Sequence, residues 1–491
     1  MSDYLMAVAV FMPIICGALI PLLPFKSRNQ RNLYAEITTI LTSVLVLALL
    51  FNRPDGVLTL IRFAGNLSIS FRIDGLGTVF AGIVSALWPL ATLYAFEYME
   101  HEGHEKYFFM FYEITYGITL GIAMADDILT MYCFYEMLTL VTLPLIMHTL
   151  TREAILASRT YLYFSLGGAA FAFIGTIFIL VYGSTEEFVP GGVLSAAALG
   201  DKTNTLLLVY VICFIGFSVK AAMWPLGSWL PKAGVAPTPV TALLHAVAVV
   251  KAGAFAAIRV TYYSFGTEFL RGTWAQTVLL VLAIITIVYG CSRALKETHI
   301  KRRLAYSTMS NLSYILFGAL LMSPVGLVGA LAHMIGHAVT KICSFFCAGA
   351  IMHQTGKQYI HELDGMGRKM PWVFVTFTVS AFSLMGVPGF CAFVSKWYLA
   401  KATVISTHPL APVGIAALLI SALLTAIYML SIVVRAFFPG KDFDYAAIEG
   451  YKDPGWQMLL PLTVFVIAMT VMGLHSTPLI HALEKLAALV Q

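Results

Sequence analysis

The amino-acid sequence predicts an all-α, polytopic membrane protein with about 14 transmembrane helices. Composition is the first reason. Of the 491 residues, 59% are hydrophobic and only 11% are charged, whereas soluble domains carry roughly 25% charged residues. The second reason is that the apolar residues gather in runs of about 17–25, the length that crosses the hydrocarbon core as a helix. A chain of this kind needs lipid as its solvent.

The expected spans follow one another along the whole chain. They comprise residues 4–23, 32–51, 76–96, 107–124, 128–149, 158–182, 205–225, 238–262, 273–294, 303–322, 325–352, 371–400, 411–435 and 456–475. Residues 54–74 instead alternate apolar and polar side chains around Gly65-Asn66, which is typical of a β-hairpin, and we expect it outside the bilayer. The tail, residues 476–491, favours a short amphipathic helix at the membrane interface.

Lysine and arginine are distributed unevenly between the loops. They concentrate after the odd-numbered spans, most clearly in the cluster Arg293, Lys296, Lys301, Arg302 and Arg303. The positive-inside rule places such loops in the cytoplasm. We therefore expect a multi-pass protein of the prokaryotic cytoplasmic membrane with both termini extracytoplasmic.

Several chemistries find no support in the sequence. The seven cysteines are scattered without a C-x-x-C pair, so the pattern predicts no disulfide framework, zinc site or iron–sulfur cluster. No glycine-rich phosphate loop is present. We therefore expect no metal, no cofactor and no nucleic-acid partner.

Nine ionisable residues interrupt the apolar runs. Each charge at mid-bilayer costs roughly 2.5–3.5 kcal/mol on insertion scales, so nine of them indicate a hydrated path and not an accident of packing. Arg259 stands apart, because it lies near a helix end and is expected to extend its charge to the interface. The nine are Glu113, Glu136, Lys220, His245, Lys251, His333, His337, Lys341 and Lys396.

Their spacing refines this interpretation. His333, His337 and Lys341 are four residues apart, so they form one stripe about 12 Å long on a helix, which suits a proton relay. The alternative is a polar seam between two packed helices. His245 and Lys251 are six apart and would point about 120° away from each other, as successive stations and not as a chelating pair.

Backbone-breaking residues accompany two of the lysines. Four prolines between residues 225 and 239 follow Lys220, and the stretch GVPG, residues 386–389, precedes Lys396. Both segments predict discontinuous helices, an ordinary proline kink being the alternative. Broken backbone at membrane depth persists only where protein or a wet cavity surrounds it. One break beside a lysine in each half indicates an internal repeat with one site per half.

Glu136 is the best candidate partner for Lys220. Burial disfavours the charged ammonium and a nearby carboxylate favours it, so a closed pair keeps Lys220 protonated. When the pair opens, Lys220 can pass its proton through water to Lys251, with His245 as a helper. The pair would thus act as a switch.

Five segments together resemble a known family. They are DDILTMYCFYEML (126–138), the block from Gly216 to Gly253, KRRLAYSTMSNLSYI (301–315), HMIGHAVTKICSFFCAGAI (333–351) and GVPGFCAFVSKWYL (386–399). Through them the chain resembles the antiporter-like membrane subunits of respiratory complex I, group 4 membrane-bound hydrogenases and Mrp-type cation/proton antiporters. The resemblance covers about residues 75–435.

The resemblance implies an architecture of 14 core helices. Two inverted five-helix repeats would contain discontinuous helices 7 and 12. The expected units are residues 1–106 with three helices and the hairpin, 107–262 as the first repeat, 263–435 as the second, and 436–491 with the last helix and the tail.

The resemblance also implies roles for the buried residues. Glu136 and Lys220 would be the ion pair of the fifth and seventh helices, and Lys251 the central lysine with His245 beside it. The relay of the eleventh helix would be His333, His337 and Lys341, and the exit would be Lys396. Glu113 and Asp127 are further candidates. Glu113 would pair with Lys220 or Lys251, or stay a hydrogen-bonded buried acid.

The function expected from these features is proton translocation within a multi-subunit, energy-converting membrane complex. Its partners would be other membrane subunits, including homologous antiporter-like ones, the lipid bilayer and, in some complexes, soluble redox subunits. The chain itself would be a non-redox subunit of an NADH:quinone oxidoreductase or a hydrogenase, or part of an Mrp complex without redox partners. The alternatives are a Na⁺/H⁺ antiporter module, an ion-driven partner of an uptake system and a proton-inert scaffold. Sodium prefers oxygen ligands, and the abundance of lysine and histidine favours protons.

Overall fold

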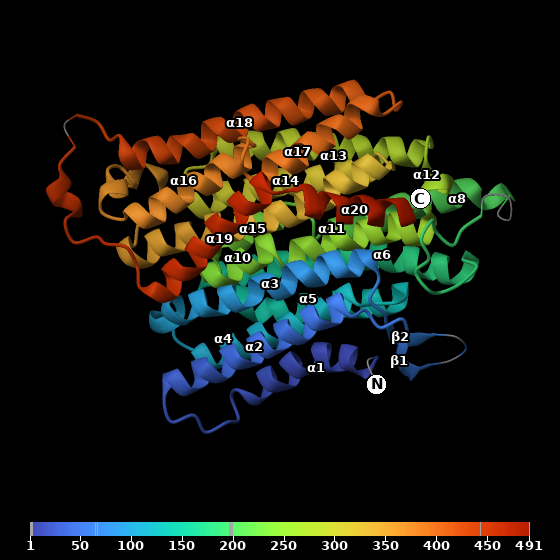
Figure 1. Cartoon of the computed structure of the whole chain (residues 1–491), viewed down its shortest axis with the longest axis horizontal. Helices are drawn as coiled ribbons and strands as arrows, with labels where there is room; N and C mark the ends of the chain where they lie inside the picture. The colour runs from blue at the N-terminus through green and yellow to red at the C-terminus, as the bar shows by residue number, and fades with distance from the viewer. Residues whose placement is uncertain (1–2, 64, 66, 196–199, 442, 491) are drawn as a thin grey trace.

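The computed structural model of the chain is a bundle of roughly parallel helices with a small hairpin at one end (Figure 1). It describes residues 3–63, 65, 67–195, 200–441 and 443–490. Ten helices in this described part are long and apolar enough to cross a membrane, and two shorter apolar helices accompany them. The all-α membrane architecture is therefore confirmed, whereas the number of about 14 spans stays a prediction.

Each apolar run up to residue 182 forms one helix. These helices are α1 (Tyr4–Leu19), α2 (Arg28–Phe51), α3 (Gly75–Tyr98), α4 (Glu105–Ala123), α5 (Ile128–Ile146) and α6 (Arg152–Tyr182). Between α2 and α3 lie β1 (Leu58–Arg62) and β2 (Ser68–Phe71), which pair antiparallel as the alternating pattern predicted. Figure 1 places this hairpin, the start of α1 and the end of α20 at the same end of the bundle.

The next two runs are broken. They form α8 (Thr203–Ser218), α9 (Trp229–Lys232), α10 (Thr238–Ala246) and α11 (Val249–Arg259), which continues as a π-helical turn, Val260–Phe265. The break after α8 contains Pro225, which cannot donate a backbone hydrogen bond. The break between α10 and α11 was not predicted. There the backbone leaves the helical region at Val247 (φ −124°, ψ −61°) and Ala248 (φ −86°, ψ −83°).

The second half contains α12 to α20. Its helices are α12 (Thr267–Leu270), α13 (Trp274–Lys296), α14 (Ile300–Leu320), α15 (Pro324–Thr355), α16 (Pro371–Met385), α17 (Cys391–Ile405), α18 (Ala411–Phe437), α19 (Trp456–Leu474) and α20 (Thr477–Leu489). The expected run 371–400 is thus broken between α16 and α17, at the GVPG stretch. Helix α15 lies inside the bundle, where it packs against α10, α14, α16, α17 and α19.

The tail differs from its prediction as an interfacial helix. Figure 1 shows α20 running on from α19 along the bundle toward the hairpin end. It packs against α15 through an apolar face in which Ile480, Leu483 and Leu486 are buried. The amphipathic pattern therefore reflects a helix with one face on protein.

Small residues allow α6 and α8 to approach closely. A Cβ atom at Gly168 would lie 2.8 Å from both the Gly216 carbonyl oxygen and the Val219 Cβ. A Cβ atom on the neighbouring Gly167 would have no atom within 4 Å. Close backbone contact at small residues is a main source of helix association in membranes.

We predict that Gly168→Ala destabilises the bundle by about 1–3 kcal/mol, because the methyl group forces the two helices apart. Gly167→Ala is the matched control and should gain up to about 1 kcal/mol from helix propensity. Unfolding by SDS in mixed micelles measures both. Equal effects at the two positions would contradict the close packing of α6 on α8.

Candidate functional site

Lys220 and Glu136 form a buried pair between α5 and the break after α8. Lys220 Nζ lies 3.9 Å from Glu136 Oε1, and the two side chains are 0% and 22% exposed. The ammonium also donates a hydrogen bond to the Tyr135 carbonyl and lies 3.3 Å from the centroid of the Tyr135 ring. Tyr135 in turn donates from its hydroxyl to the Phe217 carbonyl at 2.8 Å. Lys220 therefore keeps favourable contacts besides the carboxylate.

A second group joins α11 to α15. Lys251, in the first turn of α11, forms a hydrogen bond with His337 Nδ1. The rings of His337 and His333 lie 5.8 Å apart, one turn along α15. His333 is held on both sides, by Ser395 Oγ at 2.8 Å from Nδ1 and by Asn311 Oδ1 at 3.2 Å from Nε2. All three ionisable side chains are fully buried.

Lys396 continues this group in α17. Its Nζ donates to the carbonyl of Leu384 in the last turn of α16, across the break. The centroid of the Tyr314 ring lies 5.5 Å from Lys396 Nζ and 5.2 Å from the centroid of the His333 ring. The left-handed Gly386 (φ +89°) leaves room for the Lys396 side chain, since a Cβ at Gly386 would be 3.1 Å from Lys396 Cδ. His333 and Lys396 thus share one aromatic neighbour.

The two groups meet at Gly253. A Cβ on this residue would lie 2.6 Å from the Ala221 nitrogen and 2.9 Å from the Lys220 Cβ, so α11 packs directly against the broken segment. Among the described residues no hydrogen bond joins Lys220 to Lys251. In the part of the chain that the structure describes, several buried polar atoms of α5 and of the end of α8 have no protein hydrogen-bond partner, including Ser218 Oγ, Thr139 Oγ1 and Glu136 Oε1. Buried polar atoms are normally satisfied, and ordered water is the usual partner where protein supplies none.

The residues linked so far, with the Lys220 pair, are called the row: Glu136, Lys220, Lys251, His337, His333 and Lys396. In the described structure, His245 and Lys341 have no hydrogen bond to any of them. Lys341 Nζ donates to the Leu304 carbonyl at 3.0 Å and lies 5.9 Å from the Phe345 ring. The His245 ring packs 4.7 Å from the same Phe345, and neither of its nitrogens has a protein partner in the described structure. The α10–α11 break separates His245 from Lys251, so their angular relation on a continuous helix does not apply. The hydrogen-bonded partner of Lys251 is His337.

Glu113 and Asp127 lie away from the row. Glu113 is fully buried and accepts a 2.7 Å hydrogen bond from Thr39 of α2, so it is the hydrogen-bonded acid among the alternatives above. Asp127 caps α5, where it accepts bonds from the Thr130 nitrogen at 2.7 Å and from Ser70 Oγ at 2.6 Å. Neither carboxylate contacts a lysine of the row.

Two family models match this chain. The model described as NADH:quinone oxidoreductase/Mrp antiporter, TM, matches residues 125–437, which contain every residue of the row. The model described as NADH-Ubiquinone oxidoreductase (complex I), chain 5 N-terminus, matches residues 61–109. The chain belongs to the NADH:quinone oxidoreductase/Mrp antiporter family. Its ten long apolar helices accordingly make it a multi-pass membrane protein.

Two relatives illustrate what this chain is similar to. NADH-quinone oxidoreductase subunit N from Desulforudis audaxviator (strain MP104C) is 29% identical over 426 residues, which cover 84% of this chain and 83% of the relative. Na(+)/H(+) antiporter subunit A1 from Staphylococcus aureus (strain MRSA252) is 27% identical over 461 residues, covering 88% of this chain. This chain spans only 57% of the length of that antiporter subunit.

Solved structures show the same fold. A chain of the membrane-bound sulfane sulfur reductase, an archaeal respiratory membrane complex, has a TM-score of 0.85 at 22% identity and covers 99% of this chain and 97% of its own. A chain of the Mrp complex from Dietzia sp. DQ12-45-1b has a TM-score of 0.87 at 24% identity, covering 98% and 52%. These likenesses concern the fold.

Some polar partners in this antiporter-family chain were missed at the sequence level. Ser395, Asn311 and Tyr314 hold His333 and Lys396, yet serine, asparagine and tyrosine are ordinary residues of packed helices. Ser395 immediately precedes Lys396, which was the only available signal. The acceptor of Lys396 is a backbone carbonyl, which side-chain patterns cannot reveal.

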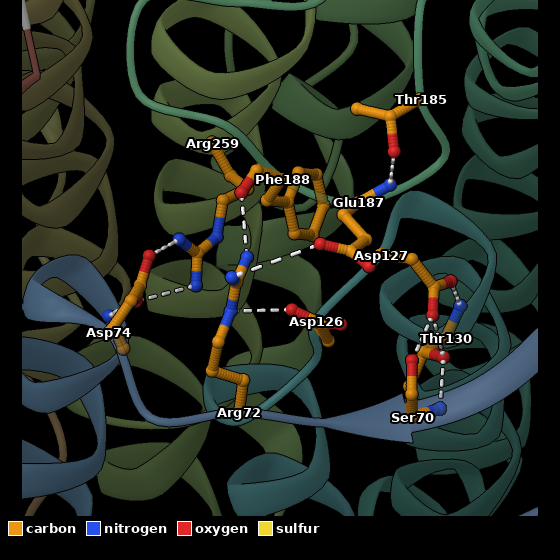
Figure 2. Close-up of polar contacts among 11 residues, drawn as sticks. Ser70, Arg72, Asp74, Asp126, Asp127, Thr130, Thr185, Glu187, Phe188 and Arg259 are labelled. Atoms are coloured by element: carbon orange, nitrogen blue, oxygen red, sulfur yellow. Dashed lines mark hydrogen bonds and ion pairs between the residues drawn. The ribbon is translucent and has the colours of Figure 1, made fainter. Parts of the chain in front are cut away.

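Arg259 corrects another expectation. It does not extend to the interface: it is 1% exposed and pairs with Asp74, with Nη2 3.0 Å from Oδ1. Figure 2 shows Arg259 against Phe188 and facing Asp74, with Arg72 and Asp126 beside them. The guanidinium carbon lies 4.8 Å from the Phe188 ring and 4.7 Å from the Tyr263 ring. The end of α11 that carries Arg259 therefore lies inside the protein, because loop 183–195 covers it.

The same network ties the hairpin end together. Arg72, just after β2, pairs with Asp126 and donates to the Phe188 carbonyl at 2.7 Å. Burial raises the pKa of the Asp126 carboxyl to about 6, while the Arg72 guanidinium acts in the opposite direction. Asp74 also caps α3 by accepting from the Gly77 nitrogen at 2.7 Å. One carboxylate therefore orients α3 and neutralises the buried cation of α11.

We predict that Asp74→Asn destabilises the protein by about 3–5 kcal/mol, because the amide still caps α3 but leaves Arg259 buried without a counter-charge. Unfolding by SDS in mixed micelles measures the loss.

Glu187→Gln is the matched control. Its carboxylate is 4.0 Å from Arg72 and its side chain is 56% exposed, so the change should cost less than about 1 kcal/mol. An Asp74→Asn variant as stable as Glu187→Gln would contradict the role of the buried pair.

Proposed function

We propose that this antiporter-family chain carries protons across the membrane along a row of buried and partly buried side chains. The observation that supports the proposal best is the direct contact of Lys251, His337 and His333 inside the bundle, with an ion-paired lysine on one side and a partly exposed lysine on the other. The row comprises Glu136, Lys220, Lys251, His337, His333 and Lys396.

The Glu136–Lys220 pair is the switch of this row. At 3.9 Å the pair is longer than a charge-assisted hydrogen bond of about 2.7–2.9 Å. The Tyr135 carbonyl and ring hold the ammonium in place while the carboxylate moves. Movement of Glu136 away from Lys220 removes the counter-charge, and the buried ammonium then releases its proton. Besides α5, helix α11 packs against Lys220 at Gly253, two residues beyond Lys251.

The histidines take the proton onward. A neutral imidazole carries one donor and one acceptor nitrogen, so a proton received at Nδ1 of His337 can leave from Nε2. His337 Nε2 has no protein partner among the described residues, and it is therefore available to water. Ser395 and Asn311 fix the ring of His333, and Tyr314 separates it from Lys396. Lys396 delivers the proton at the α16–α17 break.

Membership of the family supports a proposed assembly, and the charge of the loops supports a proposed orientation. We infer that the chain works in a multi-subunit membrane complex, beside other membrane subunits that include homologous antiporter-like ones, in a prokaryotic cytoplasmic membrane. We place both termini on the extracytoplasmic side. Residues 107–262 and 263–435 form the two repeats, each with one broken helix and one lysine beside it, and 1–106 and 436–491 flank them.

We predict that Lys220→Met lowers proton translocation at least about tenfold, because the row loses its switchable proton carrier. The complex is purified through a tag on this chain, reconstituted into liposomes and assayed with a pH-sensitive dye. Glu113→Gln is the matched control: it also neutralises a buried charge, but outside the row, and should keep near-normal transport.

The same assay distinguishes protons from sodium. Replacing Na⁺ by choline should leave transport unchanged, since lysine and imidazole do not coordinate Na⁺. Normal transport by an assembled Lys220→Met complex would contradict the proposal. Strict dependence on Na⁺ would instead support a Na⁺/H⁺ antiporter module.

A further inference from the structure

An open groove of about 760 Å³ runs along the face of the bundle between α3, α19 and α20. Figure 1 shows α19 and α20 in front of the bundle, beside α3. Helix α15 contributes Ile335 and Val339 to the groove. On α15 these two residues lie two positions from His333 and His337, about 200° around the helix, so the groove lies on the opposite side of α15 from the histidines.

The lining of the groove is apolar apart from three residues. Gly82, Ala86, Leu87 and Leu90 of α3 form one wall, and leucines of α20 with Phe465 of α19 form the other. The three polar residues are Thr78, Arg53 and Lys485, and no carboxylate lines the groove. The groove therefore combines a hydrocarbon surface with positive charge only.

The positive charge lies at one end. Arg53 follows α2 on the way into the hairpin. Lys485 lies in the last turns of α20, which ends at the same end of the bundle as the hairpin (Figure 1). Leu486 packs on Gly75 at the start of α3, where a Cβ would be 2.7 Å from Leu486 Cδ1. Both cations are exposed, and within the described residues neither has a carboxylate at ion-pair distance.

The dimensions suit a lipid chain. From Gly75 to Leu90 the wall of α3 extends about 22 Å at 1.5 Å per residue. One leaflet of hydrocarbon is about 15 Å deep, half of a core of about 30 Å. An acyl chain that enters at the charged end can therefore lie in the groove along its whole length.

We propose that this groove binds an anionic phospholipid, with an acyl chain along α3 and α20 and the headgroup phosphate between Arg53 and Lys485. Charge complementarity selects the anionic lipid: two cations, neither with a carboxylate at ion-pair distance in the described structure, line the groove. The site is independent of the proposed proton path, although its occupant packs against the helix that carries the histidines.

A photocrosslinking experiment tests the proposal. Benzoylphenylalanine replaces Ala86, an exposed groove residue, and the full chain is placed in nanodiscs of phosphatidylcholine with a small fraction of phosphatidylglycerol. After irradiation, mass spectrometry should find phosphatidylglycerol adducts in large excess over the mixing ratio. The double change Arg53→Gln and Lys485→Gln should reduce that selectivity by about 30-fold, the factor for two basic side chains at an anionic surface.

Matched controls make the outcome decisive. Lys202→Gln removes an exposed lysine before α8 that lies over the Tyr182 ring, and it should leave the adducts unchanged. Benzoylphenylalanine at Ala416, an exposed position of α18, should crosslink lipids in proportion to the mixture. Thermal unfolding of each variant verifies folding.

Two results would overturn the proposal. One is an adduct pattern at position 86 that follows the lipid mixture or survives the double change. The other is crosslinking at position 86, in membranes containing the parent complex, to a neighbouring protein subunit and not to lipid.

Discussion

The cost of placing ionised side chains in hydrocarbon governs this structure. Each such charge costs roughly 2.5–3.5 kcal/mol, so a row of lysines and histidines persists only if protein surrounds it and supplies partners. Broken helices supply some of these partners. The last turn of an interrupted helix has carbonyls without helical partners, and Lys396 uses one of them, at Leu384. Lys220 lies inside the other break and finds its acceptor, the Tyr135 carbonyl, on α5. The lysine at each break thus donates to a backbone carbonyl. For Lys396 this carbonyl belongs to the broken helix, and for Lys220 it belongs to a neighbouring helix.

The buried charge at the hairpin end is also surrounded by protein that supplies partners, but its partners differ from those of the row. Arg259 is as buried as Lys220 and Lys251, but it contacts a carboxylate and three aromatic rings. Lys220 instead has a carboxylate at 3.9 Å and a backbone acceptor that remains when the carboxylate leaves. A tight pair stabilises the junction of α3 and α11, whereas a loose pair can switch. In the proposed mechanism, the geometry of each pair, and not its burial, therefore distinguishes a structural pair from one that switches.

Much of this could be predicted from the sequence, because hydropathy and proline act locally. The apolar runs predicted the helices up to α6 and the hairpin, and the prolines and glycines predicted the breaks beside Lys220 and Lys396. The α10–α11 break was missed because Val247 and Ala248 are ordinary helix residues and tertiary packing bends them. The partners of Arg259 and Glu113 come from segments 185 and 74 residues away, which spacing along one helix cannot reveal. The hydrogen bond between Lys251 and His337 likewise joins residues 86 positions apart, and no sequence pattern predicted it.

The central claim is that the two buried groups form one hydrated path that crosses the contact at Gly253. A high-resolution cryo-EM map of the chain in a lipid nanodisc tests it most directly. We expect ordered water between Lys220 Nζ and Lys251 Nζ, with successive polar atoms no more than about 3.2 Å apart. Apolar side chains packed without gaps between the two amines, or side chains of the row turned toward lipid, would contradict the account.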